Sequence, residues 1–240
     1  MRNDILALVV GYTLMLFAAP MAIMVGASLF LGEIWMALRA FLFPIILSLS
    51  LGYGLRFWAI SEGASGERLR DREAFAAVAL GWPIVVGIGA LPFWLGGMFH
   101  GPVELFAGNS TLHEVLGGFV RAFFESMSGF TTTGGTVIDP RTSPICQPAV
   151  SDCINSQSKV LLLWRSMSQW LGGMGIIMLG MLLLARYLGG GMSMAQAELT
   201  GPSLSRLRPR IQNTAVTLWS IYIIFTLAEI FLLLVLGGME

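Results

Sequence analysis

The chain has 240 residues, of which 55% are hydrophobic and only 12% are charged, and its mean hydropathy is +0.76. A soluble domain of this composition would lack the polar surface that water requires, so the composition favours a membrane protein. The formal net charge is zero, with 14 basic and 14 acidic residues, and gives no indication of a nucleic-acid partner.

Five stretches are long and apolar enough to cross a bilayer as helices, for which about 20 residues are needed. In chain order they run from Ile5 to Leu31, Trp35 to Ile60, Ala74 to Met98, Leu161 to Tyr187 and Ile211 to Leu236. The first is longer than the apolar part of a secretory signal peptide, so we interpret it as a transmembrane helix. The sequence therefore predicts an all-α membrane fold surrounded by membrane lipid.

Arginine residues indicate how these helices are oriented. They gather in the link between the second and third stretches and in the link between the fourth and fifth: Arg56, Arg68, Arg70 and Arg72, and then Arg186, Arg206, Arg208 and Arg210. Because cytoplasmic loops of membrane proteins are rich in Lys and Arg, both links are predicted to be cytoplasmic. This places the N-terminus inside the cell and residues 99–158 outside.

The outer segment contains a helical pattern that is too short to cross the membrane. At about 1.5 Å per residue, a helix from Leu116 to Phe130 would reach only partway through the hydrocarbon. It is followed by a threonine, glycine and valine run, Thr131 to Ile138, which favours extended backbone. Because non-helical backbone at membrane depth must be buried in protein or face water, the pattern predicts a re-entrant pore loop.

The extended run has the chemistry of a cation pathway. Backbone carbonyls can replace the hydration shell of a monovalent cation without introducing fixed charge. Glycine allows successive carbonyls to face one axis, and the helix ending near Phe130 points its negative end at the same place. The predicted ion pathway comprises Thr131, Thr132, Thr133, Gly134 and Gly135. The residue chemistry leaves open an alternative, a glycine-containing outer turn packed against the helices.

Two strings resemble the Trk/Ktr/HKT superfamily of potassium transporters. FFESMSGFTTTG, from Phe123 to Gly134, resembles the first pore loop of that family, and the string from Leu163 to Ile176 resembles the helix that follows it. In the family, four linked helix, pore-loop, helix units surround one pathway, with one filter glycine in each unit. The resemblance implies Gly134 as the filter glycine, potassium bound at Thr132, Thr133 and Gly134, and no covalent cofactor. Potassium is then the substrate.

The resemblance also implies a domain organisation. Residues 1–73 would form two preceding helices and a cytoplasmic loop, as in the Trk branch, and residues 74–188 the first unit. Residues 189–240 would form a cytoplasmic loop and the first helix of an incomplete second unit. Because a ring needs four pore loops and one such string occurs, we interpret the chain as a truncated product or a fragment of a longer chain.

The expected function is potassium uptake across the cytoplasmic (inner) membrane. Resemblance to Trk systems implies a homodimer of the complete subunit and a cytoplasmic, nucleotide-binding, TrkA-like regulatory partner. An enzyme is not expected, because neither a GxSxG string nor zinc-ligand spacing occurs in the sequence. The alternative function is a non-conducting membrane scaffold or assembly subunit.

Ionisable residues at membrane depth are costly and are usually paired or directed towards a pore. Glu125 is expected to be held by Arg165 or by Arg121, which lies four residues away on the same helix, and to support the filter. The alternative is that these groups reach interfacial water.

Two further patterns concern glycine and cysteine. Gly172, Gly173 and Gly175 interrupt a helical pattern and predict a kink, or else close helix packing. Cys146 and Cys153 flank a short polar loop on the outer side, where a disulfide is expected; two free thiols are the alternative.

Overall fold

The computed structural model describes residues 2–64, 71–146, 152–196 and 208–237. Within helices, side chains are left undescribed at residues 71, 72, 74, 178–196 and 208–215, so the predicted cytoplasmic arginines from Arg68 to Arg72 and from Arg206 to Arg210 lie outside the described side chains. The helices in chain order are α1 (Asn3–Leu31), α2 (Ile34–Ser61), α3 (Asp71–Leu95), α4 (Pro102–Phe106), α5 (Leu112–Phe130), α6 (Lys159–Gln196) and α7 (Arg208–Leu236).

The predicted all-α membrane fold is confirmed. The described residues contain no strand, and four helices are long and apolar enough to span a membrane: Asn3–Leu31, Ile34–Ser61, Phe75–Leu95 and Val216–Leu236. The fifth predicted span, from Leu161 to Tyr187, lies within α6, and its side chains beyond residue 177 are outside the described part.

One predicted boundary is wrong for a physical reason. The stretch that was expected to continue to Met98 stops as a helix at Leu95. Gly97 adopts a φ of 82°, and the Met98 N–H donates to the Phe93 carbonyl at 3.1 Å, which closes the helix with a left-handed residue. Apolar composition alone did not reveal this stop, because the residues beyond it are also apolar.

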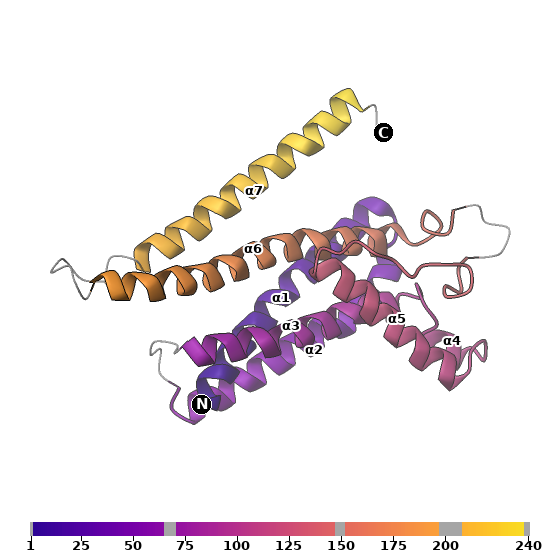
Figure 1. The fold of residues 1–240 in the computed structure, drawn as a ribbon. Coiled ribbons are helices and arrows are strands. Elements are labelled where there is room, and N and C mark those ends of the chain that lie inside the picture. Colours follow the sequence, from indigo (N-terminus) through magenta and orange to yellow (C-terminus); the bar gives the residue numbers. More distant parts are fainter. Residues whose placement is uncertain (1, 65–70, 147–151, 197–207, 238–240) are drawn as a thin grey trace. The chain divides into compact units, whose positions relative to one another are not determined.

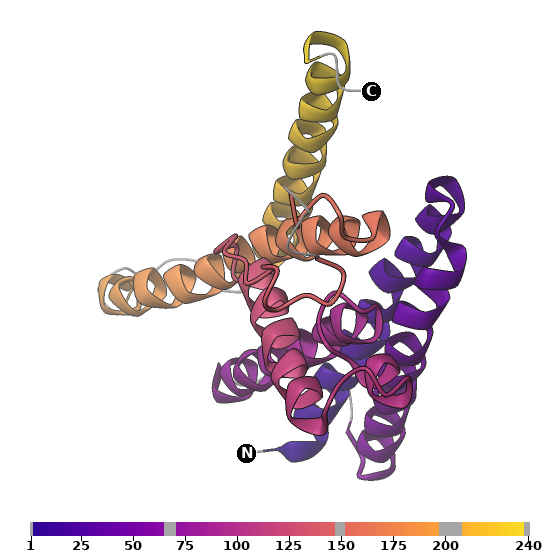
Figure 2. The same cartoon turned by 90° about the vertical axis from the view of Figure 1, so that its right-hand side faces the viewer.

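The chain divides into two compact units, residues 1–171 and 172–240, and the division falls within α6. In the first unit, α1 and α2 form an antiparallel hairpin, α3 packs against both, and α5 packs against α3 (Figure 1, Figure 2). The hairpin is close enough that a Cβ on Gly11 would lie 2.9 Å from the carbonyl oxygen of Gly52. Small residues permit this close backbone approach between membrane helices.

Hydrogen bonds from buried side chains attach α5 and the start of α6 to α3. Ser126 Oγ of α5 donates to the Val86 carbonyl at 2.7 Å, and Trp164 Nε1 of α6 donates to the Gly89 carbonyl at 2.9 Å. Both side chains are buried, so each bond satisfies a polar group that has no access to solvent within this unit. These bonds place the end of α5 and the first turns of α6 against the same part of α3.

The second unit contains the rest of α6 and α7. The described side chains of α7, from Val216 to Leu236, are apolar over most of their length, and none is buried within the chain. A helix that is apolar around its whole circumference suits a lipid or protein environment rather than water.

Candidate functional site

The short helix α5 begins earlier than predicted. It starts at Leu112 rather than Leu116, because Thr111 and Glu114 form a capping box: the Glu114 N–H donates to Thr111 Oγ1 at 3.4 Å, and the Thr111 N–H donates to Glu114 Oε2 at 2.7 Å. Hydrogen bonds from the Thr111 N–H and hydroxyl lower the pKa of the Glu114 carboxyl. The far end of α5 is Phe130, as the sequence predicted.

The chain leaves α5 through a left-handed turn at Thr132. The Thr132 N–H donates to Gly129 at 2.9 Å and the Thr133 N–H to Ser128 at 3.0 Å, which is the Schellman arrangement at a helix C-terminus. Thr132 has a φ of 56° and is the one non-glycine residue with positive φ in the described part of the chain. Glycine usually occupies this position, and a β-branched residue there is strained. Such strain is found most often at functional sites.

After this turn, residues 133–138 have neither helical nor strand structure and return alongside the last turns of α5. Ser128 Oγ donates to the Gly135 carbonyl at 2.7 Å, and the Val137 N–H donates to Glu125 Oε1 at 2.7 Å. Gly134 adopts a φ of 72°, a second left-handed residue two positions after Thr132. The return segment is therefore held against α5 by both side chains and backbone.

Glu125 is the central group behind this segment. Its side chain is fully buried, and it accepts bonds from the Thr136 hydroxyl and the Val137 N–H through Oε1 and from Arg165 Nε through Oε2 at 3.0 Å. Of the two cations proposed as its partner, Arg165 of α6 is the one that forms the ion pair. Arg121 forms no ion pair within the described part of the chain.

Arg165 also contacts the return segment directly. Its terminal Nη2 donates to the carbonyl oxygens of Gly134 at 3.1 Å and Gly135 at 3.2 Å. One guanidinium therefore joins α6, the buried carboxylate on α5 and the two glycine carbonyls. The planar fork of arginine donors suits such a multiple contact, whereas lysine would offer a single charge centre.

The carbonyls of the three threonines before Gly134 lack the hydrogen-bond donors that the Gly134 and Gly135 carbonyls have. Within the part of the chain that the structure describes, no hydrogen bond reaches the carbonyl oxygens of Thr131, Thr132 and Thr133. Thr132, Thr133 and Gly134 are also exposed in this chain. A backbone carbonyl is a strong hydrogen-bond acceptor, so these three oxygens, which have no protein donor among the described residues, can accept a ligand.

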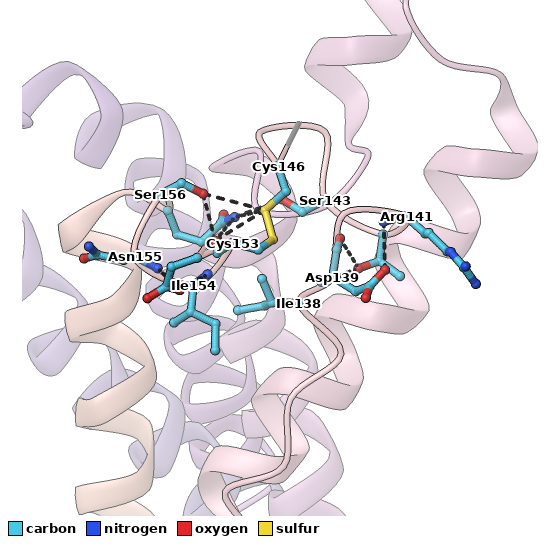
Figure 3. Close-up of a disulfide and its surroundings, with 12 residues drawn as sticks. Ile138, Asp139, Arg141, Ser143, Cys146, Cys153, Ile154, Asn155 and Ser156 are labelled. Carbon is cyan, nitrogen blue, oxygen red and sulfur yellow. Dashed lines mark hydrogen bonds between the residues drawn. A yellow bond between two sulfur atoms is a disulfide. The ribbon is translucent and has the colours of Figure 1, made fainter. Parts of the chain in front are cut away.

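The loop that follows contains the predicted disulfide residues, and the sulfurs of Cys146 and Cys153 are bonded to each other (Figure 3). Gln157 Nε2 donates to Ser143 Oγ at 3.0 Å and to the Cys153 carbonyl at 3.1 Å, which closes the loop from inside. Figure 3 shows Ile138, at the end of the return segment, beneath the disulfide. The disulfide therefore lies over the far end of the return segment, at Ile138.

The remaining predicted residues lie elsewhere. Gly172, Gly173 and Gly175 are within the continuous helix α6, at the start of the second unit, and the kink stays a prediction. Two features were missed: the left-handed Thr132, because threonine is rare in that conformation, and Glu33, which contacts the start of α6. No local pattern points to Glu33, because its partners are 125 or more positions away.

Comparison with known proteins identifies the family. Residues 103–238 match the family model TrkH, described as cation transport protein. The chain is 35% identical over 221 residues to the Trk system potassium uptake protein TrkH of Escherichia coli K12, covering 92% of this chain and 39% of that protein. It is 33% identical over 221 residues to TrkH of Halomonas elongata, covering 91% of this chain and 38% of the relative.

A solved structure gives the same result. The crystal structure of the potassium transporter TrkH from Vibrio parahaemolyticus matches 95% of this chain and 38% of its own, with a TM-score of 0.65 and 28% sequence identity. The chain thus spans about two fifths of the length of the relatives it matches. These proteins are transporters rather than enzymes, and the chain belongs to the TrkH family of cation transport proteins.

Proposed function

We propose that this chain provides one filter segment of a Trk-type potassium uptake subunit, in which backbone carbonyls from Thr131 to Gly135 coordinate potassium. The observation that carries the proposal is that the carbonyls of Thr131, Thr132 and Thr133 accept no hydrogen bond from the described residues, and that Thr132 and Thr133 are exposed. A cation that loses its water needs such oxygens as replacement ligands.

The conformation of the segment supports this role. In an ordinary extended strand, successive carbonyls point to opposite sides. Left-handed residues at Thr132 and Gly134 break that alternation, so neighbouring carbonyls can turn towards a common side. The C-terminal end of α5 lies directly before them and carries a partial negative charge of about half an elementary charge, which favours a cation.

The ion pair between Glu125 and Arg165 also supports a filter role for the segment from Thr131 to Gly135. Arg165 fixes the carbonyls of Gly134 and Gly135, and Glu125 neutralises its charge. The pair therefore adds rigidity without adding a net positive charge that would repel potassium. The Gly134 carbonyl, already bonded to Arg165, would contribute less to coordination than the carbonyls of Thr131 to Thr133.

For the whole protein, the proposed activity is potassium uptake across the cytoplasmic (inner) membrane, with the N-terminus in the cytoplasm. The names of the relatives, potassium uptake proteins of Trk systems, support this activity. A complete pathway would combine this segment with three others. A homodimer and a TrkA-like nucleotide-binding regulatory partner belong to the same proposal.

The test is potassium-dependent growth of cells that lack their own uptake systems, using the full-length gene that encodes this chain. The proposal predicts rescue at low potassium and loss of rescue on Gly134→Val, while membrane levels of the protein stay unchanged. Equal rescue by the wild type and by Gly134→Val would contradict the proposed filter role of this segment. Absence of potassium uptake by a correctly inserted protein would favour the alternative, a non-conducting scaffold.

A further inference from the structure

The link between α1 and α2 places a carboxylate on the start of α6. Glu33 accepts bonds from Ser158 Oγ at 2.6 Å, from the Lys159 N–H at 3.1 Å and from the Val160 N–H at 3.0 Å. The first N–H groups of a helix have no partners within the helix, and the helix dipole favours negative charge there. Helix α6 therefore begins on an acceptor that the N-terminal hairpin supplies.

The helix that Glu33 caps is the helix that carries Arg165. At 1.5 Å per residue, Arg165 lies about 8 Å along the axis from Val160. Over so short a distance a helix behaves as a stiff rod, so the position of its first turn sets the position of Arg165. A displacement of that first turn would therefore move Arg165, and with it the contacts that Arg165 makes with Glu125 and the Gly134 carbonyl.

A second contact joins the hairpin to the same place. The ring of Phe17 on α1 lies 5.7 Å from Phe130 and 5.9 Å from Trp164, and the ring of Phe41 on α2 lies 5.7 Å from Trp164, measured between centroids. All four side chains are buried. Phe130 is the last residue of α5 and Trp164 directly precedes Arg165, so the hairpin packs behind both ends of the filter support.

We infer that the α1–α2 hairpin positions the filter, with Glu33 as a positioning residue that fixes the start of α6 and thereby Arg165. The inference rests on the proposed function. It assigns a role to the two helices that precede the pore-loop unit. The hairpin would set how well the carbonyls fit potassium, without touching the ion.

The test measures potassium and sodium uptake by the full-length protein in cells without their own potassium uptake systems, normalised to the amount of protein in the membrane. Glu33→Ala and Glu33→Gln should lower the ratio of potassium to sodium uptake on the order of tenfold, the effect of losing charge-assisted hydrogen bonds. Glu62→Gln, at the opposite end of α2, is the control and should leave the ratio unchanged. Glu33→Asp keeps the charge and should give a smaller loss.

A double variant separates positioning from simple capping. In Glu33→Ala/Ser158→Asp, the new aspartate can cap α6 locally but cannot tie it to the hairpin. We expect this protein to keep the lowered uptake ratio of Glu33→Ala, although its α6 is capped. Full recovery of the ratio would overturn the inference, because a cap alone would then suffice.

Two further results distinguish a failure of this inference from a failure of the proposed filter. An unchanged ratio in every Glu33 variant, together with a lowered ratio in Arg165→Gln, would overturn the inference and leave the proposed filter intact. An unchanged ratio in Arg165→Gln and Gly134→Ala would contradict the proposed filter, and the inference with it.

Discussion

Arg165 donates from Nε to the fully buried carboxylate of Glu125 at 3.0 Å, and from its terminal nitrogen to the carbonyl of Gly134 at 3.1 Å. The pair connects two helices to the segment that we propose as the filter. Because Glu125 also accepts bonds from Thr136 and Val137, it links the pair to two further residues of the return segment.

Reversing the pair is the first prediction. Glu125→Arg or Arg165→Glu alone should abolish potassium uptake, because each places two like charges side by side and breaks a pair in which Glu125 is fully buried, at a cost of about 3–5 kcal/mol. The double reversal should restore part of the uptake. The measurement is potassium-dependent growth together with protein levels in the membrane. Absence of any rescue would contradict the pairing role, and Arg121→Glu, on the same helix as Glu125, serves as the comparison.

Gly134 gives a prediction with a matched control. Its φ is 72°, and a Cβ there would meet nothing nearer than Gln169 at 3.9 Å, so alanine would fit the space but strain the backbone. Gly108 has a φ of 74° and nothing within 4 Å, so alanine there imposes similar strain far from the filter. Each substitution should cost about 1–2 kcal/mol in stability.

The two variants should differ in transport. Gly134→Ala should lower the ratio of potassium to sodium uptake, whereas Gly108→Ala should lower only thermal stability. Equal effects on the uptake ratio would mean that strain in general, rather than the filter conformation, is responsible.

The lowered pKa of Glu33 predicts that the stability of the folded protein depends on pH. Burial acts to raise the pKa of its carboxyl, but hydrogen bonds from Ser158, Val160 and Lys159 and the charge of Lys159 outweigh it, so the pKa lies below the usual 4.5. A lowered pKa in the folded state means that the stabilisation is fully present above pH 4.5 and is lost as the pH falls through the folded pKa.

The measurement is thermal unfolding of the purified protein in detergent between neutral pH and values well below 4.5. The difference in melting temperature between wild type and Glu33→Gln should be constant near neutrality and shrink in acid. Salt should reduce it, because the group is partly exposed. If the difference in melting temperature grew in acid, the role of the Glu33 carboxylate as a cap of α6 would be contradicted.

The disulfide gives the fourth prediction. Cys146 and Cys153 are separated by 7 positions, and closing so short a loop stabilises a folded state by about 2.5 kcal/mol in the chain-entropy model. Reduction, or Cys146→Ser/Cys153→Ser, should lower the melting temperature. The comparison is wild type with and without reductant; a serine variant that still responds to reductant would show that another group is responsible.

Much of this fold could be predicted from the sequence, but less of the candidate site could. Apolar length was enough to place α1, α2 and α7, because the bilayer imposes about 20 apolar residues on a spanning helix. It failed at Met98, where the helix stops through backbone conformation at Gly97 within an apolar run. The start of α5 was missed because a capping box lies upstream of the apolar pattern.

For the site, the cost of a buried charge predicted that Glu125 would have a cationic partner, but not which one. Arg121 was close in sequence, whereas Arg165 was brought there by the packing of α6 against α5. Glu33 could not be found this way, because a helix cap is normally sought in the residues just before the helix. Thr132 was hidden for a similar reason: left-handed backbone is expected at glycine, and the Schellman turn imposes it on threonine.

The most direct test of the filter is crystallographic. Thallium, a potassium substitute with strong anomalous scattering, can be introduced into crystals of the full-length protein. The account predicts an anomalous peak at the carbonyl oxygens of Thr131, Thr132 and Thr133, which weakens in Gly134→Ala. Peaks found only elsewhere along the pathway, with these three carbonyls facing lipid or protein, would contradict it.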